Sequence, residues 1–208
     1  MVERKIQPVQ DNTEKQQTYR KMLGKYSNAM NQKFFCEALM IDYAMIEDRL
    51  RSMIYHMGFL PDRNTTKIWK NARPYLLRIV NEYKHKKEND ALGTTTLNGK
   101  IKIVRSVFLW ASNTDGGYRD NPHLAVLKSR LDEIEHERVF QVLDDIDRWR
   151  EYRNEVVHAM MNKNILRLEE TMQPYAAEGM RLARELDAIE REIKSGNKIR
   201  RKINLPMR

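Results

Sequence analysis

The residues best suited to chemistry in this chain are an arginine, an asparagine and a histidine within the run WREYRNEVVHAMM. Arg153 is followed directly by Asn154, and His158 comes five positions after the arginine. A histidine can give or take a proton near neutral pH, and a guanidinium presents a planar fork of donors to phosphate oxygens. Side chains of these types are suited to proton transfer and to binding an anion.

The spacing of apolar residues around this motif predicts a helix. Helical geometry puts Asn154 and His158 one turn apart on the same face. Arg153 instead falls among apolar positions such as Trp149 and Val156. Because an unpaired buried charge is very costly, its guanidinium needs a carboxylate, carbonyl oxygens or a bound phosphate. An internal salt bridge and a phosphate site are both compatible with this pattern.

Two acids in the first long helical pattern are candidates for the partner of Arg153. Asp42 stands among apolar residues such as Leu39 and Ile46, an unusual setting for a carboxylate. Glu47 lies at the edge of the same helical face. Either acid could instead be a solvated charge at the edge of its helix.

Apolar residues at steps of three and four predict helices from end to end, with no strand alternation between them. The helical patterns cover residues 28–57, 65–83, 100–111, 123–161 and 164–194. Residues 12–27 extend the first pattern, and Pro74 should kink the second or mark its start. The fourth should break near Glu135–Glu137. The expected fold is an all-α antiparallel helical bundle, a single domain over residues 1–195 in which 59–121 form a helical insertion.

The motif Arg-Asn-x3-His in such a helical chain resembles the signature of the HEPN superfamily (higher eukaryotes and prokaryotes nucleotide-binding domains). The resemblance covers about residues 28–57 and 123–193. It implies an all-α bundle that acts as a metal-independent endoribonuclease in toxin or antiviral defence systems, with no cofactor. It also implies a homodimer that brings two motifs into one cleft, and an antitoxin or defence-complex partner.

The resemblance assigns a role to each residue of the motif. His158 would be the general base or acid, Arg153 would stabilise charge on the phosphoryl group, and Asn154 would hold a phosphate oxygen or orient the histidine. Family members often carry a supporting acid on their first helix, which favours Glu47 over Asp42. Two alternatives remain: a non-catalytic module of the family that binds nucleotide or RNA or scaffolds a complex, and a helical interaction protein in which the motif is coincidental.

The charge distribution favours an anionic partner such as RNA. The chain carries a formal net charge of +9, and the segment 194–208 holds six basic residues and no acid. Residues 196–208 are therefore expected to form a basic tail that binds phosphate through Lys198, Arg200, Arg201 and Lys202. The alternatives are a solvated tail and a segment that packs through its apolar residues Ile199, Ile203 and Leu205.

Other classes of protein find no support in the sequence. No apolar run approaches the roughly eighteen residues of a membrane span, and residues 1–12 lack the apolar stretch of a signal peptide. With a single cysteine, Cys36, a reducing cytoplasm is the expected location. No second histidine or cysteine stands at metal-ligand spacing, and no phosphate-binding loop motif occurs. We expect no metal, no cofactor and no membrane association.

Overall fold

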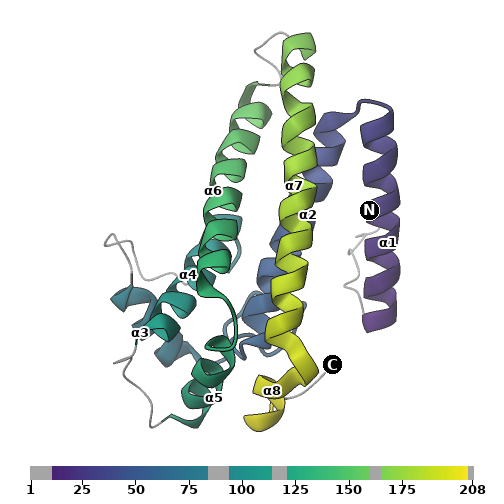
Figure 1. Ribbon diagram of the computed structural model, residues 1–208. Coiled ribbons are helices and arrows are strands. Elements are labelled where there is room, and N and C mark those ends of the chain that lie inside the picture. The colour runs from purple at the N-terminus through teal and green to yellow at the C-terminus, as the bar shows by residue number, and fades with distance from the viewer. Residues whose placement is uncertain (1–10, 84–93, 114–120, 160–164, 206–208) are drawn as a thin grey trace, which may run out of the picture.

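The computed structural model describes residues 11–83, 94–113, 121–159 and 165–205, with the side chains of 165–168 left out (Figure 1). These residues form helices and connecting turns, and no strand occurs among them, so the expected all-α class is confirmed. The helices are α1 (Asn12–Asn31), α2 (Phe35–His56), α3 (Arg73–Glu82), α4 (Leu97–Ser112), α5 (Pro122–Leu131), α6 (His136–Ala159), α7 (Ile165–Lys194) and α8 (Lys198–Lys202), with a 3-10 turn (Ser195–Asn197) before the last.

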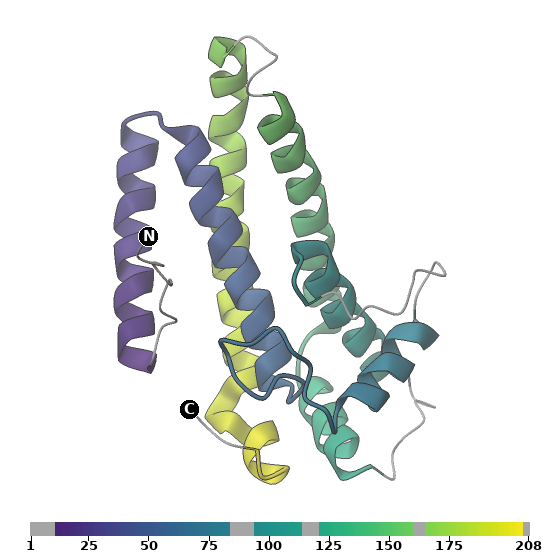
Figure 2. The ribbon, with the colours of Figure 1, turned by 180° about the vertical axis from the view of Figure 1, so that it is seen from behind.

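The two helices α2 and α7 form the centre of the molecule, with α1 against one side of α2 and α6 against α7 on the other (Figures 1 and 2). The contact between α2 and α7 is made by apolar residues at helical spacing. Ile46 and Leu50 of α2, and Leu186 and Ile189 of α7, are completely buried. This burial explains why both helices persist over many turns, because an amphipathic face gains most of its stability from packing. None of the described helices is long and apolar enough to cross a membrane.

The first helical pattern differs from its sequence-based extension. Residues 12–27 do not continue the helix of residues 35–56; they belong to a separate helix, α1, which folds back antiparallel to α2. The turn contains Lys33 in the left-handed region at φ 61°, and the amide of Phe34 donates to the carbonyl of Ala29 at 2.7 Å. No glycine or proline marks this turn, so the sequence carried no conventional signal for it.

The described parts of residues 59–121 include the helices α3 and α4. Helix α3 starts at Arg73 with Pro74 in its first turn, where the missing proline N–H costs nothing, so the proline marks a start and not a kink. Helix α4 begins at Leu97, and the hydroxyl of Thr96 accepts from the amide of Gly99 at 3.1 Å. Because α4 packs on α2, α3 and α6, it supports the motif helix from the side. The loop expected at 112–122 falls largely outside the described residues.

The fourth pattern breaks where the sequence predicted. Helix α5 ends at Leu131 and α6 starts at His136, so the motif helix is a separate element of 24 residues. The segment after α7 departs from the expected free tail. It turns at Gly196 (φ 65°) and Asn197 (φ 53°), and α8 then packs on α5. The body of the domain therefore continues beyond residue 195.

Candidate functional site

The motif lies in the last turns of α6, where this helix passes the first half of α2. The half-buried guanidinium of Arg153 touches three neutral groups. Its Nη1 donates to Oδ1 of Asn154 at 3.3 Å, its Nη2 lies 3.2 Å from the sulfur of Met40, and its Cζ lies 4.4 Å from the centre of the Tyr43 ring. The ring face attracts the cation and holds the guanidinium in place without neutralising it.

Arg153 has no carboxylate partner among the described residues. Its Nε is buried and lacks a hydrogen-bond acceptor there as well. The acid favoured for it from the sequence, Glu47, pairs with Lys100 at 2.8 Å instead. That part of the prediction is wrong because Lys100, itself 1% exposed, is carried on α4 into contact with the glutamate and needs a counter-charge there. Within the described residues, no acid compensates the charge of Arg153.

The second acid, Asp42, does not pair with Arg153 either. It is completely buried, and neither carboxyl oxygen has a hydrogen-bond partner among the described residues. A Cβ added at Gly179 would lie 2.7 Å from Oδ2 of Asp42 and 2.8 Å from the Trp149 ring, so the carboxyl group fills the space between α2, α6 and α7. Burial raises the pKa of Asp42 to about 8. The apolar setting that the sequence indicated is confirmed, but it makes Asp42 a neutral core residue.

The other two motif residues lie at increasing exposure on one face of α6. Asn154 is half-buried beside Arg153, and His158, one turn further, is exposed to solvent. Since the Oδ1 of Asn154 accepts from Arg153, its amide nitrogen is the group that can donate to a ligand. Val156 and Ala159 bury the opposite face. The structure thus places an arginine, an amide donor and an accessible imidazole in order along one helix.

Aromatic contacts fix the motif helix against α7. The rings of Tyr152 and Tyr175 are stacked, with centroids 3.3 Å apart and planes inclined by 9°. One turn earlier, Nε1 of the buried Trp149 donates to the carbonyl of Tyr175 at 2.8 Å. A site built on a helix held in this way keeps its side chains in a defined register.

Apolar side chains remain exposed around the motif. Met40 on α2, Val157 on α6 and Tyr175 on α7 are exposed to 48%, 40% and 37%, and each lies on an element that contacts the motif or carries it. Such a surface can form an interface with a second molecule, although single exposed apolar residues also occur on ordinary surfaces.

The basic residues assigned to the tail have different environments. Arg200 is 1% exposed, stacks 3.8 Å from the Tyr55 ring, and donates to the carbonyls of Tyr55, Leu60 and Pro61 at 2.9, 2.9 and 3.3 Å. Its assignment to phosphate binding is wrong, because the guanidinium is used to satisfy carbonyls at the end of α2 and in the following loop.

The remaining tail cations stay on the surface. Lys198 lies 4.0 Å from Glu133, and Arg201 and Lys202 are exposed on α8. The apolar residues Ile199 and Leu205 are buried within the same chain, which explains why the segment is ordered.

No group of three or more histidine, cysteine, aspartate or glutamate side chains in the described part of the chain could hold a metal ion. Comparison of the chain with known protein families, with curated proteins and with solved structures finds no match.

Proposed function

We propose that this protein is a metal-independent endoribonuclease of the HEPN type, in which Arg153, Asn154 and His158 form the active site. The observation that supports this most is the environment of Arg153. Among the described residues the half-buried guanidinium is held by a ring face and a sulfur atom and has no carboxylate as counter-ion, and the exposed His158 follows on the same helix. A phosphate group of a substrate would supply it.

The chemistry follows from these side chains. His158 would take the proton of an RNA 2′-hydroxyl, whose oxygen attacks the adjacent phosphorus and displaces the 5′-oxygen of the next nucleotide. A proton then goes to the leaving oxygen, so that the products carry a 2′,3′-cyclic phosphate and a 5′-hydroxyl. Arg153 would stabilise the charge on the phosphoryl oxygens, and the amide of Asn154 would hold one of them.

A homodimer would complete this site. One motif offers a single histidine, whereas the reaction uses a base and an acid, so a second His158 across a two-fold axis would supply the other group. The exposed side chains of Met40, Val157 and Tyr175 give such an interface apolar contacts beside the motif. The same surface favours a second candidate function, a non-catalytic module that binds a protein partner, such as an antitoxin or a member of a defence complex.

The test compares cleavage of a labelled single-stranded RNA, in the presence of EDTA, by the wild type and three variants. His158→Ala should lower the cleavage rate by a factor of about 10² to 10⁴, the usual loss for a general acid–base group. Arg153→Lys keeps the charge and loses the planar fork, and should be similarly impaired. Glu155→Gln, an exposed neighbour on the same helix, is the matched control and should retain the wild-type rate.

The outcomes separate the candidate functions. The free energy of unfolding of His158→Ala should lie within about 0.5 kcal/mol of the wild-type value, because the side chain is exposed. A loss of cleavage rate in this variant would therefore reflect chemistry. Full activity of both motif variants, or activity abolished by EDTA, would contradict the mechanism. RNA binding without cleavage by the wild type would favour the non-catalytic module.

Mixing two inactive variants tests the shared site. A heterodimer of Arg153→Lys and His158→Ala chains brings an intact arginine from one chain and an intact histidine from the other to the axis. Partial recovery of cleavage on mixing is expected. A chain that sediments as a monomer at micromolar concentration, yet cleaves RNA, would refute the dimer.

A further inference from the structure

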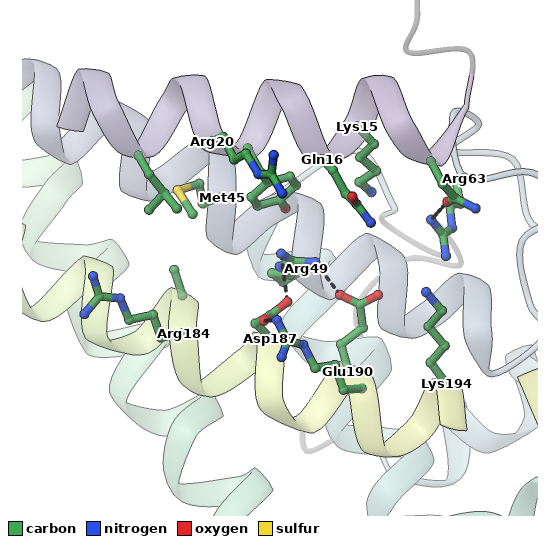
Figure 3. A pocket seen from close by; sticks show the side chains of 15 residues that line it. Lys15, Gln16, Arg20, Met45, Arg49, Arg63, Arg184, Asp187, Glu190 and Lys194 are labelled. Carbon is green, nitrogen blue, oxygen red and sulfur yellow. Dashed lines mark hydrogen bonds and ion pairs between the residues drawn. The ribbon is translucent and has the colours of Figure 1, made fainter. Parts of the chain in front are cut away.

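A second, strongly basic pocket is lined by α1, α2, α7 and the loop after α2 (Figure 3). Its volume is about 620 Å³. Of the fifteen described residues that line it, seven are lysine or arginine and two are acidic. Such an excess of one charge in a concave site raises the local concentration of anions.

The acids of the pocket are already paired within it. Asp187 accepts from Arg49 and Arg191 at 2.7 and 2.6 Å. Glu190 accepts from Arg49 at 2.7 Å and from the hydroxyl of Ser52 at 2.6 Å. These bonds hold the pocket floor together and pair both carboxylates with Arg49.

Four other cations of the pocket have no carboxylate partner among the described residues. Arg63 is held by neutral acceptors, Oδ1 of Asn12 at 2.8 Å and Nε2 of His56 at 2.9 Å. For Arg20, Arg184 and Lys194 no hydrogen bond or ion pair occurs within the described part of the chain. Figure 3 shows Arg20 reaching from α1, Lys194 from α7 and Arg63 from the loop after α2 toward the space between the helices.

These cations repel one another. Burial and the charge of Arg63 lower the pKa of Lys194, and Lys15 and Arg49 act in the same direction, against the opposing effect of Glu190. Lys15 and Arg49 also serve the packing of α1 on α2, where Lys15 pairs with Asp48 at 2.8 Å and Arg49 lies over the Tyr19 ring. An anion between the other cations would relieve their repulsion.

The spacing of the cations defines the shape of the anion. Arg184 and Lys194 are ten residues apart on α7, about 15 Å along the helix axis. Figure 3 shows Lys194 and Arg63 at one end of the pocket, Arg184 at the other, and Arg20 and Met45 between them. A single phosphate cannot reach both ends.

We propose that this pocket binds a small linear polyphosphate, either free or carried on an organic group, that bridges α1 and α7 through Arg20, Arg63, Arg184 and Lys194. The proposal does not depend on ribonuclease activity. The motif contacts α7 near Tyr175, which precedes Arg184 by nine residues, about 14 Å along the helix. Binding would fix α1, whose packing within the described residues is mainly on α2.

Calorimetry at low salt with inorganic tripolyphosphate and with ATP tests the proposal. Wild-type protein should bind tripolyphosphate with an affinity at least ten times that for inorganic phosphate. The double variant Arg20→Gln/Lys194→Gln should weaken binding by about ten-fold or more per charge removed. The matched control Lys198→Gln/Lys202→Gln removes two charges from α8, outside the pocket, and should bind like the wild type.

Melting temperatures measured in parallel show whether the variants fold. Without ligand, the pocket variant should melt at or above the wild-type temperature because repulsion is removed, and tripolyphosphate should raise the wild-type value more than the variant's. If ATP binds more tightly than tripolyphosphate, an organic group contacts the apolar lining residues Leu23 and Met45. If the two bind equally, the phosphate chain alone is recognised. Both results support the proposal. The proposal would be overturned if the wild type did not bind tripolyphosphate at millimolar concentration, or if the α8 control lost as much affinity as the pocket variant. It would also be overturned if the pocket variant lost affinity for RNA but not for tripolyphosphate.

Discussion

Replacing the buried carboxyl group of Asp42 should change how stability depends on pH. The group is completely buried between Trp149 and Gly179, and its oxygens find no donor among the described residues. Ionising it in place would leave an uncompensated charge in the core, which is why burial raises its pKa from 3.8 to about 8. Asp42→Asn keeps the size of the side chain and removes the titration.

The sign follows from proton binding. Between pH 4 and 8 the folded chain holds the Asp42 proton, whereas the unfolded chain has lost it, so the free energy of unfolding falls as the pH rises. The contribution is fully present below the unfolded pKa of about 3.9 and is lost once the pH passes about 8. At about 1.4 kcal/mol per pH unit, the whole window corresponds to roughly 6 kcal/mol, an upper limit because internal relaxation reduces it.

Urea unfolding from pH 4.5 to 8.5 measures this effect. As the pH rises, the unfolding free energy of the wild type should fall steadily relative to that of Asp42→Asn. Above pH 8 the difference should become constant. Asp132→Asn removes an exposed carboxylate from the end of α5 and should run parallel to the wild type. Parallel curves for wild type and Asp42→Asn, or a carboxyl titration of Asp42 near pH 4 by NMR, would refute the reasoning.

Two further substitutions test the packing that positions the motif and the C-terminal segment. Gly179→Ala would put a methyl group 2.7 Å from Asp42 and 2.8 Å from Trp149, and should lower the unfolding free energy in urea by about 1 to 3 kcal/mol despite the better helix propensity of alanine; an unchanged or higher value would contradict the close packing of α2, α6 and α7. Arg200→Ala leaves buried carbonyls without donors and should cost about 3 kcal/mol in the same assay, whereas the exposed control Lys202→Ala should stay within about 0.5 kcal/mol; equal small effects would restore the free basic tail.

The helices were largely predictable because their stability comes from periodic apolar faces. The break between α5 and α6 and the start of α3 at Pro74 followed from ordinary local signals. The turn between α1 and α2 did not, because Lys33 adopts a left-handed conformation without glycine or asparagine to indicate it. Tertiary packing of α1 against α2 evidently decides that turn.

Charge was harder to interpret than apolar pattern. The basic composition after residue 194 suggested a phosphate-binding tail, yet Arg200 donates its hydrogen bonds to backbone carbonyls. The apolar Ile199 beside it, which is buried, was the better indicator of packing. The basic pocket was missed altogether, since Arg20, Arg63 and Lys194 are separated by more than forty residues each and meet only in the folded chain. Glu47 likewise found its partner, Lys100, in the segment where no motif was recognised.

The most direct test of the central claim is the identity of the ends produced from RNA. Wild-type protein is incubated with a short single-stranded RNA and with the same strand carrying a 2′-deoxy nucleotide on the 5′ side of the cleaved bond, and the products are analysed by mass spectrometry. We predict 2′,3′-cyclic phosphate and 5′-hydroxyl ends from the RNA, and no cleavage at the deoxy position. Cleavage of the deoxy strand, or products with 5′-phosphate ends, would contradict a reaction through the 2′-hydroxyl at Arg153 and His158.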